Sequence, residues 1–62
     1  MTTEEIKEMD VNILLSIINL KLRDYYSNLD NLCYDMNIDK GVLINKLKEA
    51  DYLYDKELNQ FK

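Results

Sequence analysis

The sequence predicts a mainly α-helical fold, a three-helix bundle of helix-turn-helix type followed by a short C-terminal β-hairpin. Apolar side chains recur every three or four positions in three consecutive segments, which gives each segment one apolar helical face. Residues that stop and cap helices separate the second segment from the third. Apolar and polar residues then alternate near the C-terminus, as they do in a strand. We expect residues 1–62 to form a single domain.

The N-terminal lead, residues 1–9, has two possible structures. Thr2 and Glu5 have the spacing of a capping box, in which each side chain bonds the backbone amide of the other residue. This spacing predicts a short helical turn that runs through Met9. A frayed terminus is the alternative, because the first residues of a domain are often poorly ordered.

The first predicted helix spans residues 10–26, and Asp10 is its expected N-cap because a carboxylate can accept from the free amides of the first turn. Its main apolar face consists of Val11, Leu14, Leu15, Ile18, Leu22, Tyr25 and Tyr26. A second apolar arc consists of Ile13, Ile17 and Leu20, and a narrow polar stripe of Asn12, Ser16, Asn19 and Arg23. A surface helix needs only one apolar face. The second arc is therefore either covered by the N-terminal lead or the C-terminal segment, or it forms a homodimer interface.

The second and third predicted helices form the helix-turn-helix unit. The second spans residues 29–36 and is expected to be capped by Ser27. Asn37 is its natural stop, because asparagine tolerates the left-handed conformation that ends helices, and Asp39 caps the third helix, residues 39–50. So short a turn requires the two helices to cross at a steep angle. The residues expected to point inward are Leu29, Leu32, Cys33, Met36, Ile38, Leu43 and Leu47.

The C-terminal segment, residues 52–61, is predicted to form a β-hairpin. Asp55 and Lys56 would start its turn, and Asn59 would supply the left-handed residue. A final helical turn is the alternative, because the residues that follow Asp55 favour helix. In either case we expect Phe61 and one or two tyrosines to cover the open end of the core.

The sequence offers little support for catalysis. It contains no histidine, the side chain that titrates near neutral pH, and no glycine-rich phosphate loop. Cys33 lies on an apolar helical face, where a cysteine is usually a small buried hydrophobe rather than a nucleophile. A single cysteine without histidine also provides no zinc site. We therefore expect a protein that is not an enzyme and has no metal and no cofactor.

Composition also bears on location and partners. No apolar run approaches the ~20 residues that cross a bilayer, and the N-terminus is acidic where a secretory signal is basic and then apolar. We expect a cytoplasmic protein without membrane contact.

A domain of 62 residues with one cysteine has no internal disulfide to stabilise it. Such small domains often rely on a partner chain, which favours association with another protein or with a second copy.

DNA binding is the alternative function, because the helix-turn-helix unit is best known for reading DNA. The candidate contacts on the third helix are Lys40, Asn45, Lys46 and Lys48. Asn45 could contact adenine and the lysines could contact phosphates, but the helix contains no arginine. The chain has a net charge of −4, and only residues 39–50 lean positive, whereas DNA-binding proteins normally present a basic patch.

Three stretches resemble a family of short bacterial proteins: DVNILLSIINLKLRD (residues 10–24), SNLDNLC (27–33) and YLYDKELNQF (52–61). The family is found in anaerobic Firmicutes and Bacteroidetes and is known only as a domain of unknown function. The resemblance implies a shared fold but supplies no activity and no functional residues. It draws attention to Ser16, Asn19 and Arg23 in the polar stripe of the first helix.

Two interpretations of that stripe remain open. It is either a binding edge or a set of hydrogen bonds to the C-terminal hairpin, in which Arg23 and Asp24 would tie down carbonyls and amides of the loop and tail. The sequence thus predicts a small, non-enzymatic, cytoplasmic interaction module that associates with itself. Its candidate interaction residues are Ile13, Ser16, Ile17, Asn19, Leu20 and Arg23.

Overall fold

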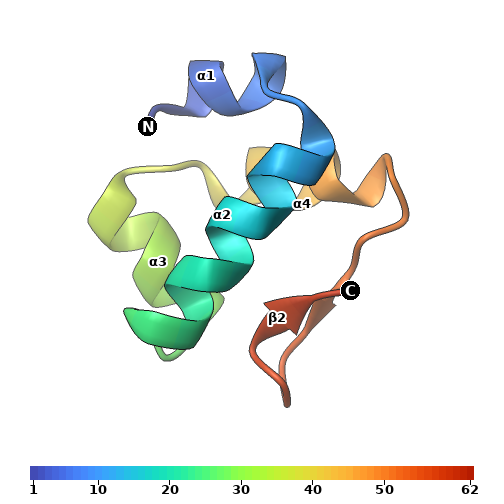
Figure 1. Ribbon diagram of the computed structural model, residues 1–62. Helices are drawn as coiled ribbons and strands as arrows, with labels where there is room; N and C mark the ends of the chain where they lie inside the picture. The colour runs from blue at the N-terminus through green and yellow to red at the C-terminus, as the bar shows by residue number, and fades with distance from the viewer.

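A computed structural model describes all residues, 1–62, and shows four helices and one two-stranded antiparallel sheet (Figure 1). The elements are α1 (Thr3–Glu8), α2 (Val11–Asp24), α3 (Leu29–Met36), α4 (Lys40–Lys48), β1 (Tyr54–Asp55) and β2 (Gln60–Phe61). The predicted fold class, mainly α with a C-terminal hairpin, is confirmed. The fourth helix comes from the N-terminal lead. In Figure 1, α2 lies in front of α4, with α3 on one side, the hairpin on the other and α1 across the top.

Helix α1 forms because its capping box is complete. The Glu5 amide donates to Thr2 Oγ1 at 3.2 Å, and the Thr2 amide donates to Glu5 Oε1 at 3.0 Å. Of the two alternatives for the lead, the helical turn is therefore the one that the chain adopts. Its single buried side chain, Ile6, is completely enclosed in the core. The helix packs mainly against α4.

Helix α2 begins as predicted but ends earlier. Asp10 Oδ1 accepts from the amides of Asn12 and Ile13 at 2.9 and 3.1 Å. At the other end, the amides of Tyr25 and Tyr26 both donate to the carbonyl of Lys21, so the chain leaves the helix after Asp24 rather than at residue 26. Tyr25 was predicted on the apolar face, but this early ending leaves it exposed.

Helix α3 ends at the residue that the sequence indicates, but its N-cap differs from the prediction. The cap is Asn28 and not Ser27, because Asn28 Oδ1 accepts from the Asn31 amide at 2.8 Å. Asn37 has the predicted left-handed conformation, with φ of 57°. The amide of Ile38 then donates to the Cys33 carbonyl at 2.9 Å, the bond that closes a Schellman motif.

Helix α4 is capped by Asp39, whose Oδ1 accepts from the Val42 amide at 3.1 Å, as predicted. The helix ends at Lys48, before the predicted residue 50, because Asp51 adopts a left-handed conformation with φ of 65°. The Tyr52 amide donates to the Leu47 carbonyl at 3.0 Å, so this end repeats the Schellman motif of α3.

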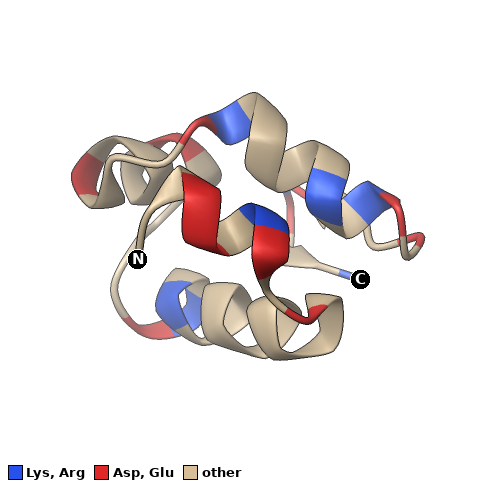
Figure 2. Cartoon of the chain, turned by 90° about the horizontal axis from the view of Figure 1, so that it is seen from above, with Lys and Arg blue, Asp and Glu red and all other residues tan.

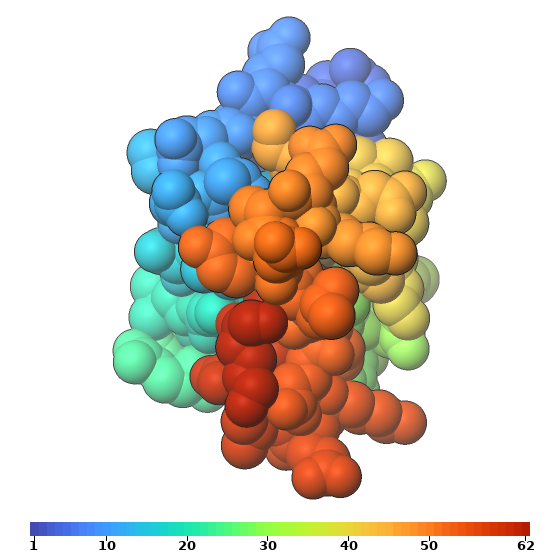
Figure 3. All heavy atoms as spheres, turned by 90° about the vertical axis from the view of Figure 1, so that its right-hand side faces the viewer, coloured from blue at the N-terminus to red at the C-terminus, as the bar shows by residue number.

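The hairpin is present, and the alternative of a final helical turn is wrong. Tyr54 lies opposite Phe61, and Asp55 lies opposite Gln60. The carboxylate of Asp55 accepts from the amides of the next turn residues, and Asn59 is the left-handed residue with φ of 53°. Phe61 is buried, and its ring lies 5.3 Å from that of Tyr54, measured between centroids. Figure 3 shows the hairpin seated beside the C-terminal half of α2.

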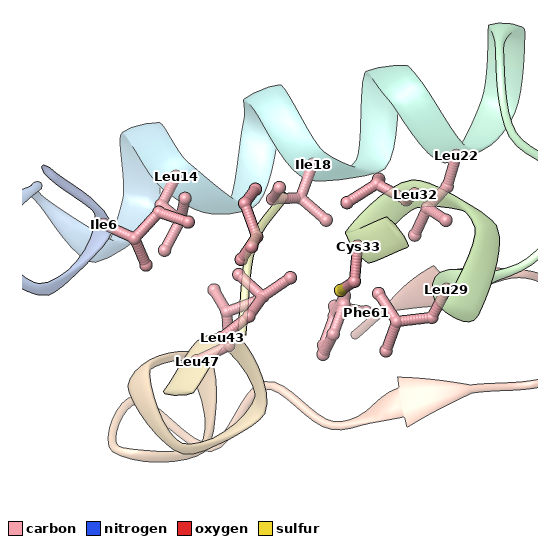
Figure 4. Packing of buried hydrophobic residues seen from close by; sticks show 11 residues of the cluster. Ile6, Leu14, Ile18, Leu22, Leu29, Leu32, Cys33, Leu43, Leu47 and Phe61 are labelled. Carbon is pink, nitrogen blue, oxygen red and sulfur yellow. The ribbon is translucent and has the colours of Figure 1, made fainter. Parts of the chain in front are cut away.

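The core is built by every helix and by the hairpin (Figure 4). It consists of Ile6, Leu14, Ile18, Leu22, Leu29, Leu32, Cys33, Ile38, Leu43, Leu47 and Phe61. In Figure 4, the residues of α2 point from one side towards those of the other elements. None of the helices combines the length and the apolar character needed to cross a membrane.

Candidate interaction surface

An apolar stripe runs along the outer face of α2. We call Ile13, Ile17 and Leu20 the α2 stripe. Ile13 is 57% exposed and Leu20 is 47% exposed, while Ile17 is half-buried. The N-terminal lead and the C-terminal segment leave Ile13 and Leu20 exposed, and Ile6 and Met9 of the lead pack against the core instead. Figure 1 shows no other element in front of α2.

An open groove lies between α2 and the hairpin. It is lined by Leu15, Ser16, Asn19, Leu20, Leu22, Arg23, Leu58, Asn59 and Gln60. Four of the six candidate interaction residues, Ser16, Asn19, Leu20 and Arg23, meet here, whereas Ile13 and Ile17 lie outside the groove. Leu58, at the tip of the hairpin, is 55% exposed and extends the apolar surface from Leu20 across the groove.

Asn19 fastens the hairpin to α2. Its Nδ2 donates to the Phe61 carbonyl at 2.9 Å, and its Oδ1 accepts from the Phe61 amide at 2.8 Å. The backbone amide and carbonyl of Phe61 point away from β1. In an antiparallel pair, successive residues alternate between bonding the partner strand and facing outward. The side-chain amide of Asn19 thus takes the place of a third strand. The hydrogen-bonding interpretation of the polar stripe applies to this residue.

Arg23 and Ser16 make no such contact. Arg23 Nε and Nη2 donate to the two carboxylate oxygens of Asp24 at 3.0 and 3.2 Å. This hydrogen-bonded pair raises the pKa of Arg23 and lowers that of Asp24. The prediction that Arg23 and Asp24 tie down the loop and tail is therefore wrong, because adjacent residues of opposite charge bond each other first. Ser16 Oγ donates to the Asn12 carbonyl in its own helix at 3.2 Å.

Asn59 has a second role that sequence reasoning missed. Its Nδ2 donates to the carbonyls of Leu22 and Tyr26, both at 3.0 Å, and so satisfies acceptors left free at the C-terminal end of α2. The Tyr54 hydroxyl donates to Asn59 Oδ1 at 2.6 Å and fixes the amide in this orientation. The partners lie more than 30 positions away in the chain, so no local sequence pattern predicts these hydrogen bonds.

The four candidate nucleic-acid contacts of α4 do not form one free basic surface. Lys40 Nζ bonds Asp30 Oδ1 at 2.6 Å, and this hydrogen bond raises the pKa of Lys40. Lys46 Nζ donates to the Lys7 carbonyl of α1 at 2.9 Å. Asn45 and Lys46 line a hollow beside α1, whereas Lys48 is exposed near the end of α4. Figure 2 shows the acidic residues of α1 between α2 and α4.

Cys33 is buried on α3, and burial raises the pKa of its thiol, which disfavours the reactive thiolate. The structure brings no three His, Cys, Asp or Glu side chains close enough together to hold a metal ion. The charged and polar groups are instead spread over the surface, where they cap helices and join elements.

These features define a small helical domain with exposed apolar residues on α2 and at the tip of the adjoining hairpin, besides the separate exposed side chains of Met1, Tyr34 and Leu53. The chain belongs to the family described as Domain of unknown function (DUF4250), whose profile matches residues 8–61. The match includes α2, α3, α4 and the hairpin, and it begins at the last residue of α1. No curated protein and no solved structure matches the chain.

Proposed function

We propose that the protein is a small, non-enzymatic, cytoplasmic interaction module that associates with itself through the α2 stripe. The observation that carries this proposal is the exposure of Ile13 and Leu20 on a helix whose opposite face already fills the core. Burying an isoleucine or leucine side chain contributes about 1.5–3 kcal/mol, so a pair of stripes offers a substantial driving force.

A second copy is the partner that the chain's own properties favour. The core contains 11 buried residues and has no disulfide to reinforce it, and a domain this small gains stability from burying further apolar surface. The net charge of −4 would repel another copy, but residues 10–26 carry equal numbers of acidic and basic side chains. The segment that carries the stripe is therefore a neutral part of an acidic protein.

Light scattering on the purified chain tests the proposal, which predicts the mass of two chains at micromolar to millimolar concentration. Ile17→Asp should reduce the mass to that of one chain, because a carboxylate at the interface would be buried without a partner. Ile13→Asp should do the same and disturbs the fold less, since Ile13 is more exposed. Tyr34→Asp, an equally charged change at an exposed position on α3, should leave the dimer intact. A single-chain mass for the unmodified protein at all concentrations would overturn self-association.

DNA binding through α4 is the second candidate. The positive balance of residues 39–50 and the exposed Lys48 support it, while the ion pair of Lys40 and the acidic residues of α1 beside α4 weigh against it. A gel-shift experiment with duplex DNA separates the two functions. Affinity at physiological salt that falls steeply as salt rises would favour the second candidate, because phosphate contacts release counterions.

A further inference from the structure

We infer that the self-association surface extends beyond α2: it crosses the groove beside Leu20 and includes Leu58 at the tip of the hairpin, which a second copy of the chain covers. The inference rests on the proposed self-association and adds the hairpin to its interface. It follows from the area that a dimer requires, from the difference between the two flanks of the α2 stripe, and from the way in which Leu58 is held.

The α2 stripe is too small to form a dimer interface by itself. A fully exposed isoleucine or leucine side chain carries about 100 Å² of apolar surface. Ile13 and Leu20 are about half exposed and Ile17 is less so, which gives the stripe on the order of 150 Å². Specific interfaces bury about 800 Å² on each partner, and weak ones somewhat less. Most of the buried area must therefore come from the surface beside the stripe.

The flank of the stripe that faces away from the hairpin is unsuited to burial. At about 100° per residue, Lys21 projects about 70° from the centre of the stripe on this side, and it forms no salt bridge within the chain. Tyr25 is exposed on the same side, and Lys21 Nζ lies 5.4 Å from the centre of its ring. A partner that covered this flank would remove the ammonium group from water without giving it a counter-charge, which is costly.

The flank towards the hairpin continues the apolar surface instead. Leu20 lies on the α2 wall of the groove, and Leu58 lies on the hairpin wall. The Ser16 hydroxyl, between them, already bonds a carbonyl of its own helix. Arg23 is the only charged residue that lines the groove, and it is already paired with the neighbouring carboxylate. A second copy on this flank therefore buries apolar surface without separating a charge from its counter-charge.

The side chain of Leu58 is exposed although its backbone is held in place. It is 55% exposed and does not pack against the core. Its amide donates to Asp55 Oδ1 at 3.1 Å, and the next residue, Asn59, is fastened to the end of α2 by two hydrogen bonds of its Nδ2. Turns usually carry small or polar residues, so the turn itself does not require a leucine here. A preorganised apolar side chain of this kind costs little entropy when a partner covers it.

Two leucines of the hairpin provide a matched test, measured as the dimer dissociation constant by light scattering over a concentration series. Leu58→Ser should raise the constant by about tenfold or more, because each dimer loses the burial of two half-exposed leucines. Leu53→Ser is the control, since Leu53 is 57% exposed on the same hairpin but does not line the groove. It should change the constant by less than about threefold. Equal effects of the two variants would overturn the inference.

Tyr25→Ser tests the opposite flank of the stripe. It should also change the dissociation constant by less than about threefold, because the inferred interface leaves this side in water. An increase as large as that for Leu58→Ser would place the interface on the flank of Lys21 and overturn the inference. Circular dichroism of each variant checks that the helices are retained.

The unmodified chain gives a readout that needs no substitution. In NMR spectra of the isotope-labelled protein at increasing concentration, the amide signals of Leu58 and Gln60 should shift together with those of the α2 stripe, while that of Leu53 should not. Shifts confined to α2 would leave self-association standing and overturn the contribution of the hairpin. A single-chain mass at all concentrations would overturn both the inference and the proposed function.

Discussion

Asn19 is the side chain that most directly joins the hairpin to the helical part of the molecule. Replacing it with alanine would leave the Phe61 amide and carbonyl without partners in a partly buried position. We expect Asn19→Ala to reduce the free energy of unfolding by about 1–3 kcal/mol, the range for a buried polar group that loses its hydrogen bonds. Urea denaturation followed by circular dichroism measures this change.

Ser16→Ala is the matched control for that variant. Ser16 also belongs to the polar stripe, but its hydroxyl bonds only the Asn12 carbonyl within α2. We expect its free energy of unfolding to stay within about 0.5 kcal/mol of the unmodified protein. Equal losses in the two variants would mean that the bonds to Phe61 contribute nothing beyond the helix itself.

The ionisation of Asp55 makes the stability of the hairpin depend on pH. The amide of Leu58, followed by the charge of Lys62 and the amide of Glu57, holds the pKa of the Asp55 carboxyl below its ordinary value. The folded state therefore favours the carboxylate. Its contribution to stability is complete above the ordinary pKa of aspartate, about 3.9, and is lost as the pH falls through the lower folded-state value. We expect the amide signals of Glu57 and Leu58 to shift below pH ~4 in NMR spectra.

Asp55→Asn isolates this effect from the other carboxylates. Asparagine still accepts hydrogen bonds from the turn amides but carries no charge, so the hairpin should persist. The difference in unfolding free energy between the unmodified chain and this variant should shrink as the pH falls. A difference that stays constant from pH 7 to pH 2 would show that the Asp55 carboxylate does not stabilise the turn.

Residues that act on their near neighbours could be predicted from the sequence, whereas the contacts of those that act at a distance could be predicted only in part. Asp10, Asn37 and Asp39 cap or stop helices within three positions of themselves, and the structure places each in its predicted role. Asn19 and Asn59 bond residues more than 30 positions away. The hydrogen-bonding interpretation of the polar stripe identified the hairpin as the element that Asn19 contacts, but not the atoms that it bonds. The partners of Asn59 were not predicted, because they are defined only after the chain has folded.

At the scale of elements, α1 is the segment whose contribution is least evident from the sequence. It has six residues and one buried side chain, Ile6, which lies outside the residues that match the family. Because Ile6 is fully enclosed, we expect Ile6→Ala to reduce the free energy of unfolding by about 2–5 kcal/mol. Chemical denaturation measures the loss, and Ile6→Val, with an expected cost of about 0.5–1.5 kcal/mol, provides a milder step in case the alanine variant does not fold.

Lys7→Ala is the control within the same helix. Its side chain is exposed and its ion pair with Glu4, at 3.4 Å, is of the surface kind that contributes little. We expect a change within about 0.5 kcal/mol. If Ile6→Ala proved as mild as Lys7→Ala, α1 would be an appendage rather than a part of the core.

Helix existence was easier to predict than helix ends, for a physical reason. The apolar period of α2, α3 and α4 marks their buried faces directly. Their ends depend on single backbone conformations, such as the left-handed Asp51 that stops α4, and aspartate is an uncommon residue for that role. The N-cap of α3 shows the same limit, since Ser27 and Asn28 are adjacent residues of similar capping preference.

At the scale of the whole molecule, the sequence predicted the apolar stripe but not the groove beside it. The stripe is a property of one helix, so the spacing of Ile13, Ile17 and Leu20 sufficed to find it. The groove arises where the hairpin meets α2, and Leu58 and Gln60 enter it only because Asn19 and Asn59 fix the hairpin there. Predicting this surface would have required the relative placement of segments about 40 positions apart.

Self-association predicts that thermal stability depends on protein concentration. A dimer that dissociates as it unfolds gains RT ln 10 for each tenfold rise in concentration, or about 0.7 kcal/mol per chain. For a domain of this size we expect Tm to rise by about 3–6 °C per tenfold increase in concentration. Ile13→Asp should show a lower Tm that does not change with concentration, while Tyr34→Asp should behave as the unmodified chain does. Because all three chains share the same core, a Tm independent of concentration in every one would show that the α2 stripe stays in water and that the fold is stable without a partner.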